Sequence, residues 1–188
     1  MGMNLVHRWL CSSKRWEKAS STRLVPWALS GLDLGAATLE IGPGYGANVP
    51  TLRSRTGALT GLEIDPALAA RLRARHGDGV RILEGDGAAM PLPDREFSSV
   101  VSFTMLHHVP SPEQQDAVFA EALRVLRPGG TFVGCDGLDS LSFRLLHLGD
   151  TCVPVSPYTL KDRLARVGFS AVEVEKGVGS FRFQARRP

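Results

Sequence analysis

The stretch Leu39-Glu40-Ile41-Gly42-Pro43-Gly44-Tyr45-Gly46 decides the fold of this chain. Its first residues belong to a short apolar strand expected over residues 37–41, and three closely spaced glycines follow that strand. Glycine has no Cβ and adopts positive φ at little cost, so the backbone can approach a ligand closely. A helix expected from about residue 47 to 55 would point its free N–H groups at the same place. The stretch therefore predicts a nucleotide-binding turn.

Strands and helices alternate after this turn. The helix at 66–76 has clear boundaries, because Asp65 suits the N-cap and Pro66 suits the first helical position. We expect further strands at 59–64, 80–84, 98–104 and 131–135, and further helices at 112–126 and from Ser156 to near Gly168. Two closing strands, 171–175 and 180–186, are joined by a short glycine-containing turn that predicts an antiparallel hairpin. This order predicts an α/β fold with a single doubly wound, mostly parallel seven-stranded sheet and an antiparallel C-terminal hairpin strand.

Composition excludes several classes of protein. The chain is 43% hydrophobic and 22% charged, and a net charge of +3 over 188 residues is too mild to indicate a nucleic-acid partner. Its apolar runs stay well short of the roughly 18 residues that a membrane span needs. Arg8 and Trp9 stand where a signal peptide would be apolar, so a cytoplasmic location is expected. Cys11, Cys135 and Cys152 form no CxxC pair, which argues against a disulfide framework or a structural zinc site.

The glycine turn alone leaves two kinds of nucleotide site open. Gly42, Gly44 and Ala47 satisfy the dinucleotide pattern G-x-G-x-x-A, and Glu63 follows at the distance expected of a ribose-binding acid. An NAD-dependent dehydrogenase is therefore one alternative. Two acids compete for the ribose, but capping of the next helix explains Asp65. Glu63 has no such structural explanation in the sequence, and we assign the ribose to it.

Later segments separate the two alternatives. They are Glu84-Gly85-Asp86-Gly87, Met90-Pro91-Leu92-Pro93-Asp94, Phe97-Ser98-Ser99-Val100-Val101, Met105-Leu106-His107-His108-Val109 and Leu123-Arg124-Val125-Leu126-Arg127-Pro128-Gly129-Gly130. In order and spacing, residues 37–169 resemble the class I S-adenosylmethionine-dependent methyltransferases, especially the small-molecule branch that includes ubiquinone- and menaquinone-biosynthesis enzymes. A dehydrogenase has no reason to carry the second half of this set. One departure is Phe97-Ser98 where the family usually has Phe-Asp, away from the cofactor end of the strand.

The resemblance implies a Rossmann-like methyltransferase fold, the cofactor S-adenosyl-L-methionine with S-adenosyl-L-homocysteine as product, and methyl transfer by in-line displacement to a small-molecule acceptor. It also implies which residues contact the cofactor: Glu40 and the turn of Gly42, Pro43, Gly44, Tyr45 and Gly46 at the methionine part, Glu63 at the ribose hydroxyls, Ile64 beside the adenine, Asp86 at the adenine amino group with Gly87 and Ala88 alongside, and Phe103 and Thr104 at the sulfonium.

Histidines mark the acceptor side of the expected site. His107 and His108 follow the fourth strand at the carboxyl end of the sheet, where ligands bind in this architecture. Either could act as a general base, with His108 slightly ahead, or could simply line the substrate pocket. His147, Asp150 and Cys152 gather in the least periodic part of the chain and are expected to line a pocket or loop. Their spacing matches no metal pattern, so no metal is expected.

We expect residues 1–188 to form a single domain around one core. Its parts would be an N-terminal helical cap at 1–30, a cofactor-binding half at 37–135, and a substrate-side loop, last helix and closing hairpin at 136–188. A helix is expected at 4–19, with Leu5, Trp9 and Trp16 on one side. This helix could lie on an anionic membrane surface, but we favour a lid that buries its apolar stripe over the site.

Other functions stay open at this stage. One is an RNA or protein methyltransferase, which only the basic N-terminal helix favours. Another is a non-catalytic S-adenosylmethionine-binding module that has kept the cofactor fold. The acceptor is unidentified, as is the choice among oxygen, nitrogen, carbon and sulfur methylation. Little chain remains to build a pocket, so a partner subunit in a homodimer or an induced-fit N-terminal helix would complete it.

Overall fold

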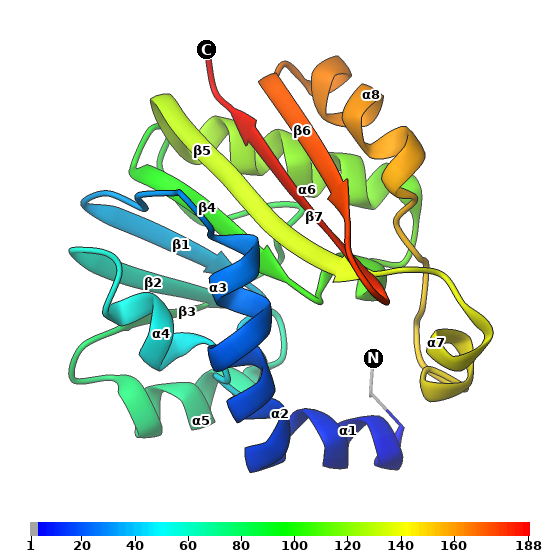
Figure 1. The fold of residues 1–188 in the computed structure, drawn as a ribbon. Coiled ribbons are helices and arrows are strands. Elements are labelled where there is room, and N and C mark those ends of the chain that lie inside the picture. The colour runs from blue at the N-terminus through cyan, green and yellow to red at the C-terminus, as the bar shows by residue number, and fades with distance from the viewer. Residues whose placement is uncertain (1–3) are drawn as a thin grey trace.

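A computed structural model describes residues 4–188 of the protein, and its centre is one seven-stranded sheet (Figure 1). The strands run in the order β3-β2-β1-β4-β5-β7-β6. Their bounds are β1 (Ala37–Ile41), β2 (Ala58–Glu63), β3 (Arg81–Glu84), β4 (Phe97–Phe103), β5 (Leu126–Gly137), β6 (Ser170–Lys176) and β7 (Ser180–Arg186). Strands β1 to β5 pair in parallel, whereas β7 is antiparallel to both of its neighbours, β5 and β6. The predicted fold class is confirmed.

Helices cover both faces of this sheet (Figure 1). One face packs against α3 (Val25–Ala28), α4 (Val49–Arg53) and α5 (Pro66–His76), and the other against α6 (Pro112–Val125) and α8 (Pro157–Val167). Each face of the sheet has its own hydrophobic core, and successive residues of β4 pack into one core and then the other, because side chains alternate across a strand. Val100 and Val101 are both fully buried, in opposite cores. Each such side chain contributes roughly 1.5–3 kcal/mol to the free energy of unfolding.

The order of the strands reverses at β1. This strand pairs with β2 on one side and with β4 on the other, so Leu39 lies opposite both Thr60 and Val100. The helices that follow β1 and β4 cover opposite faces of the sheet, which leaves a crevice between them. In an open α/β sheet, ligands bind in such a crevice outside the carboxyl ends of the strands. The chain thus places the glycine turn and the segment after β4 together.

Local capping signals fix several helix ends as predicted. Asp65 caps α5, since its Oδ1 accepts from the backbone N–H of Ala67 at 2.8 Å and of Leu68 at 3.1 Å. Ser156 caps α8, and Gly168 ends that helix with a φ of 117°. Such a left-handed residue after the last turn is cheapest for glycine.

The N-terminal region differs from the prediction of one helix at 4–19. It forms α1 (Leu5–Cys11) and α2 (Lys14–Ala19), followed by a π-helical turn, η1 (Ser20–Leu24). The break occurs because the Ser13 hydroxyl accepts from the N–H of Trp16 at 3.1 Å and starts a new helix. The expected burial of the apolar stripe is wrong for Leu5 and Trp9, which are 81% and 68% exposed, whereas Trp16 is half-buried. Helix α1 instead turns the polar His7 inward.

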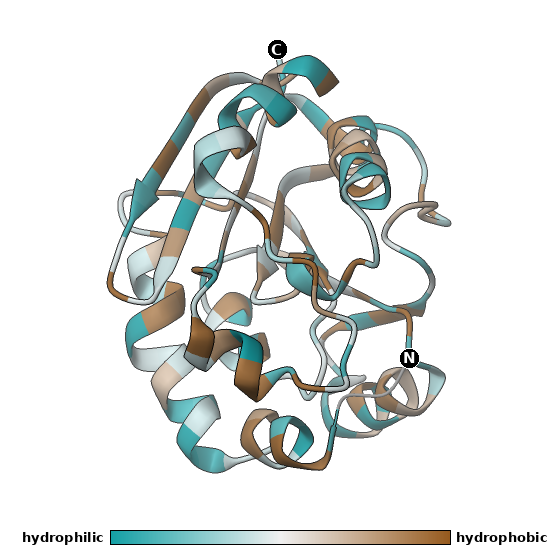
Figure 2. Cartoon of the chain, turned by 90° about the vertical axis from the view of Figure 1, so that its right-hand side faces the viewer, coloured by the Kyte–Doolittle hydropathy of each residue, from teal (hydrophilic) through white to brown (hydrophobic). Residues whose placement is uncertain are grey.

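The aperiodic stretch after β5 contains a helix that the sequence did not reveal, α7 (Leu141–Leu146). Six residues are too few to show a helical hydrophobic period. Figure 2 faces this helix and shows its apolar segments in brown, and Leu141 and Leu145 are exposed. A short 3-10 turn, η2 (Leu106–His108), follows β4. Among residues 4–188, no helix has the length and apolar character needed to cross a membrane.

Candidate active site

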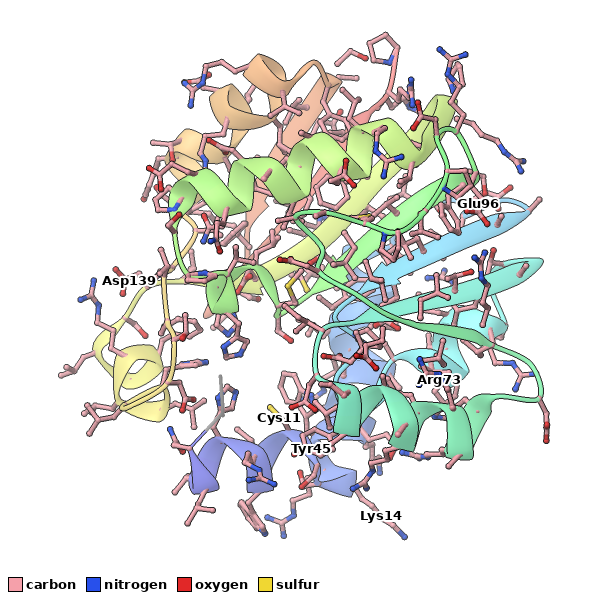
Figure 3. The ribbon with its side chains drawn as sticks, turned by 180° about the vertical axis from the view of Figure 1, so that it is seen from behind. Cys11, Lys14, Tyr45, Arg73, Glu96 and Asp139 are labelled. Atoms are coloured by element: carbon pink, nitrogen blue, oxygen red, sulfur yellow. The ribbon has the colours of Figure 1, made fainter. Side chains whose placement is uncertain are left out.

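A cavity of about 1230 Å³ opens at the carboxyl ends of the strands. Its walls come from the glycine turn, the ends of β2 and β4, the N-terminal helices and the segment around α7. Figure 3 shows Cys11 of α1 and Tyr45 of the glycine turn near each other in this region, and both line the cavity. Residues far apart in the sequence therefore line one cavity.

The glycine turn forms one wall of this cavity and needs its glycines. Gly42, Gly44 and Gly46 all have positive φ, at 65°, 56° and 79°. A Cβ on Gly42 would also lie only 2.3 Å from Cγ of Met105. The N–H of Gly46 donates to the carbonyl of Pro43 at 2.9 Å, which closes the turn. Gly42, Gly44 and Tyr45 line the cavity, whereas Gly46 is not among the described residues of its wall. Contact of this turn with a ligand stays a prediction.

Glu63 supports this turn from the end of β2. Its Oε2 accepts from the N–H of Gly44 at 2.8 Å, and its Oε1 accepts from the N–H of Asp65 at 3.0 Å. Burial raises the pKa of Glu63, and the two backbone donors oppose that rise. The expectation that Glu63 lacks a structural explanation is therefore wrong. A carboxylate offers about four acceptor positions, so two hydroxyl groups could still bind here.

Glu40 is buried behind the turn with one oxygen unpartnered. Its Oε1 accepts from Nδ2 of Asn48 at 2.9 Å, whereas Oε2 has no partner within residues 4–188. Burial raises the pKa of Glu40 to about 7, Glu63 adds to the rise, and the Asn48 amide opposes it. The Ser20 hydroxyl in turn donates to Oδ1 of Asn48 at 2.6 Å, which links η1 to the turn. Nothing in the sequence marks Asn48 or Ser20, because their contacts depend on the tertiary fold.

Of the remaining predicted cofactor residues, all but Ala88 line the same cavity. Ile64 is 65% exposed and offers an apolar surface beside Glu63. The carboxylate of Asp86 is exposed and accepts from the N–H of Ala88 at 2.8 Å, so it also shapes its own loop, next to Gly87. Phe103 is buried at the end of β4.

Thr104 stands directly after β4 in an uncommon backbone conformation. Its φ is 51°, which a β-branched residue adopts only at a cost in conformational energy. Its N–H donates to the carbonyl of Cys135 at 2.8 Å, which holds it there. Strained backbone of this kind clusters at binding sites, because the surrounding structure must hold it in place.

The predicted histidines line the cavity. Nδ1 of His107 contacts Oδ1 of Asp136 at 2.5 Å, and both side chains are buried. Nδ1 of His108 contacts the carbonyl of Thr151 at 3.2 Å. Burial, with His107 adding to it, lowers the pKa of His108 to about 3, so this ring stays neutral and is a weak base. Asp136 was not predicted, because a buried acid inside a strand gives no local signal.

The three residues predicted to line a pocket after β5 divide into two groups. His147 and Asp150 line the cavity, whereas Cys152 is not among the described residues of its wall. Oδ2 of Asp150 contacts Nδ1 of His7 at 2.7 Å, and Oδ1 accepts from the backbone N–H of Asn4. Asp150 therefore ties α1 to the segment after α7.

A family comparison agrees with this geometry. Residues 39–134 match the model of a family described as a methyltransferase domain. The chain belongs to this family. The predicted membership of the class I S-adenosylmethionine-dependent methyltransferases is confirmed, and the dehydrogenase alternative is wrong.

Curated relatives extend the match beyond the family model. A probable S-adenosylmethionine-dependent methyltransferase of Mycolicibacterium smegmatis is 32% identical over 155 residues, which are 78% of this chain and 56% of that protein. A demethylmenaquinone methyltransferase of Tropheryma whipplei is 30% identical over 137 residues, 71% of this chain and 52% of that protein. The methyltransferase chain thus spans about half the length of these relatives.

Solved structures share the fold of this methyltransferase domain. One is the complex between the Trm112 methyltransferase activator of Haloferax volcanii and a methyltransferase, with a TM-score of 0.77, 16% identity and full coverage of both chains. Another is a complex of DhpI with SAH, with a TM-score of 0.75 and 22% identity over 96% of this chain and 93% of that one. At these identities the likeness shows the architecture alone.

Proposed function

We propose that this domain binds S-adenosylmethionine and transfers its methyl group to a small-molecule acceptor. The observation that carries the proposal is the unpartnered Oε2 of Glu40, buried behind the glycine turn that lines the cavity. A buried carboxylate oxygen without a donor is costly unless a ligand supplies one. The ammonium group of a methionine moiety is a donor of the right charge. The family membership supports the same cofactor.

Each predicted cofactor residue keeps its role in this proposal. Glu40 and the turn from Gly42 to Gly46 would hold the methionine part, and Glu63 would accept from the ribose hydroxyls with its free lone pairs. Ile64 would pack on the adenine, and Asp86 would accept from its amino group, near Gly87 and Ala88. Phe103 and Thr104 would border the reacting centre. The bound cofactor supplies an activated methyl group, so the protein mainly aligns the acceptor and excludes water.

The N-terminal helices would provide that exclusion. Asn4 and His7 both contact Asp150, so α1 is fastened across the cavity to the segment after α7. Ser20 fastens the following turn to Asn48 beside Glu40. We propose that this N-terminal arm, residues 4–24, is the lid of the site. Polar contacts fasten it, Trp16 of its apolar stripe lines the cavity, and Leu5 and Trp9 face solvent.

The acceptor would be a small molecule with one nucleophilic group. Binding pockets for such ligands usually measure about 300–1,000 Å³. A cavity of about 1230 Å³ therefore has room for a cofactor and a second molecule. The hydrogen bond from His107 to Asp136 leaves Nε2 of His107 buried without a partner among the described residues, so it can accept a proton from the acceptor. We place this role on His107 ahead of His108.

Ligand binding tests the proposed function directly. S-adenosylhomocysteine should raise the melting temperature of the protein, because a ligand that binds only the native state stabilises it. NAD should leave the melting temperature unchanged. Calorimetry should agree, with heat of binding from S-adenosylhomocysteine alone. A response to NAD with none to S-adenosylhomocysteine would overturn the proposal.

A further inference from the structure

Four of the five histidines of the chain meet on one wall of the cavity. His7 comes from α1, His107 and His108 come from η2, and His147 follows α7. The ring centroids of His7 and His147 lie 4.4 Å apart, those of His107 and His108 4.1 Å, and those of His107 and His147 4.7 Å. Three separate segments of the chain therefore converge to form this histidine cluster.

The hydrogen bonds of these rings all use the same nitrogen. Nδ1 of His147 contacts the carbonyl of Phe143 at 2.7 Å, and Nδ1 of His108 contacts the carbonyl of Thr151. A carbonyl oxygen can only accept, so both Nδ1 atoms carry the proton. Nδ1 of His7 likewise faces the carboxylate of Asp150. In a neutral imidazole with a protonated Nδ1, the lone pair of Nε2 is free.

In two of these rings, the lone pair on Nε2 accepts no hydrogen bond from the described residues. Nε2 of His147 is buried and has no hydrogen-bond partner in residues 4–188, and the same holds for Nε2 of His107. Buried polar atoms without partners are rare in native proteins, and a bound ion is one standard explanation. Of these two atoms, Nε2 of His147 belongs to a group of three histidines whose ring nitrogens lie close enough together to share an ion.

We propose that His7, His108 and His147 bind a divalent transition-metal ion of the zinc class. One ring nitrogen from each residue lies within 4.8 Å of those of the other two. Zinc–nitrogen bonds of about 2.0–2.1 Å place the ligand nitrogens of a tetrahedral site about 3.4 Å apart. The rings therefore need only a small inward movement to share one ion. Imidazole nitrogen is a preferred ligand for zinc, copper, nickel and iron.

The surroundings supply what such a site needs. Asp150 accepts from His7 at Nδ1, which leaves Nε2 for the ion, and this carboxylate–histidine–metal arrangement orients the ring. Three protein ligands leave a fourth position open, as catalytic zinc sites do. Because all three histidines line the cavity, that position faces the acceptor side. The sequence did not predict the site, since positions 7, 108 and 147 share no local spacing.

On the proposed function, the open position would hold an oxygen or sulfur atom of the methyl acceptor. A metal ion in this place acts as a template that orients the substrate. The acceptor class would then be a molecule with a hydroxyl, carboxylate or thiol group. Metal binding itself does not depend on that role.

Metal titration of the whole protein tests the inference. After treatment with a chelator and dialysis, the protein is titrated with Zn²⁺ in a calorimeter and with Co²⁺ under visible absorption. We expect one ion per chain and the intense d–d bands of a tetrahedral Co²⁺ site. His147→Ala and His108→Gln should abolish these bands. Asp150→Asn should weaken Zn²⁺ binding by about 10–100-fold, as the loss of an outer-shell partner does.

A matched control uses the fifth histidine. His76 lies at the end of α5, so His76→Ala should bind Zn²⁺ as the wild type does. The inference is overturned if the wild type binds no ion, if His147→Ala and His108→Gln both bind as tightly as the wild type, or if His76→Ala alone loses binding. Binding of S-adenosylhomocysteine to each variant shows that it is folded. Absence of that binding in the wild type would refute the proposed function and leave the metal result intact.

Discussion

Oε2 of Glu63 accepts a hydrogen bond from the backbone N–H of Gly44 at 2.8 Å, so the acid at the end of β2 holds the central glycine of the turn after β1. The same carboxylate accepts from Asp65 at the start of α5. One side chain thus braces two elements and also faces the cavity. Changes at Glu63 should therefore affect both ligand binding and stability.

Glu63→Ala should weaken ligand binding and also destabilise the fold. It should weaken binding of S-adenosylhomocysteine by at least about tenfold, because charge-assisted hydrogen bonds are worth roughly 1.5–3 kcal/mol each. It should also lower the free energy of unfolding by about 1–3 kcal/mol, since the N–H of Gly44 loses its partner. Asp65→Ala is the matched control and should lose about 1 kcal/mol of stability, through capping, while binding is unchanged. Calorimetry and urea melts measure both effects, and reversed phenotypes would move the ribose role to Asp65.

Glu40→Gln should change how stability depends on pH. The carboxyl of Glu40 has a pKa of about 7 in the fold and near 4.5 in the unfolded chain. Between these values the folded protein binds one more proton than the unfolded one, so the free energy of unfolding falls as pH rises from about 4.5 to 7. The loss is at most about 3 kcal/mol, at 1.36 kcal/mol per pH unit. Glu40→Gln should remove this pH-dependent loss of stability, because an amide does not titrate.

Urea melts of the two proteins at a series of pH values check this prediction. The stability of Glu40→Gln relative to the wild type should rise up to about pH 7 and then stay constant. Glu63 is present in both proteins, so its own titration cancels to first order. A difference that does not vary with pH would show that Glu40 is ionised in the fold throughout this range.

Gly42→Ala tests whether the turn depends on its glycines. The added Cβ would lie 2.3 Å from Cγ of Met105. A residue with a side chain would also have to adopt a φ of 65°. Gly129→Ala is a suitable control, because its φ is 76° and nothing lies within 4 Å of the added atom. The control should lose only the cost of the left-handed conformation, about 1–2 kcal/mol. Gly42→Ala should lose more and should also fail to bind S-adenosylhomocysteine in calorimetry.

Deletion of residues 1–19 tests the N-terminal arm as a lid. The domain should stay folded, because both cores lie outside this segment, but cofactor binding and turnover should weaken as water enters the site. Trp9→Glu is the control, since Trp9 is 68% exposed and should be neutral for a lid. A membrane-surface helix predicts the opposite: the intact protein pellets with anionic liposomes, and Trp9→Glu abolishes pelleting.

The sequence predicted those parts of the fold that local signals determine. The bounds of β1, α5 and β7 agree to the residue, because capping residues, proline and alternation mark them. The division into α1 and α2 and the existence of α7 were missed, since such short helices depend on tertiary contacts more than on their own propensity.

The site was predictable to a similar extent. The glycine turn and Glu63 follow from strand ends and spacing. Asn48 and Asp136 do not, because their partners Glu40 and His107 become neighbours only through the fold. The same is true of His7, which is 101 residues away from His108 and meets it only when α1 crosses the cavity. Sequence spacing thus finds residues that one loop brings together, and misses those that several elements bring together.

The position of β7 between β5 and β6 has a consequence for synthesis on the ribosome. Strand β6 is made before β7, yet within the sheet it pairs only with β7. A nascent chain that has reached β6 therefore cannot add it to the sheet, and the outer edge of β5 stays unpaired until residues 180–186 emerge. Unpaired strand edges are where chains associate with one another. Translational pausing just before this strand would therefore prolong the interval in which the edge of β5 is open to association with another chain.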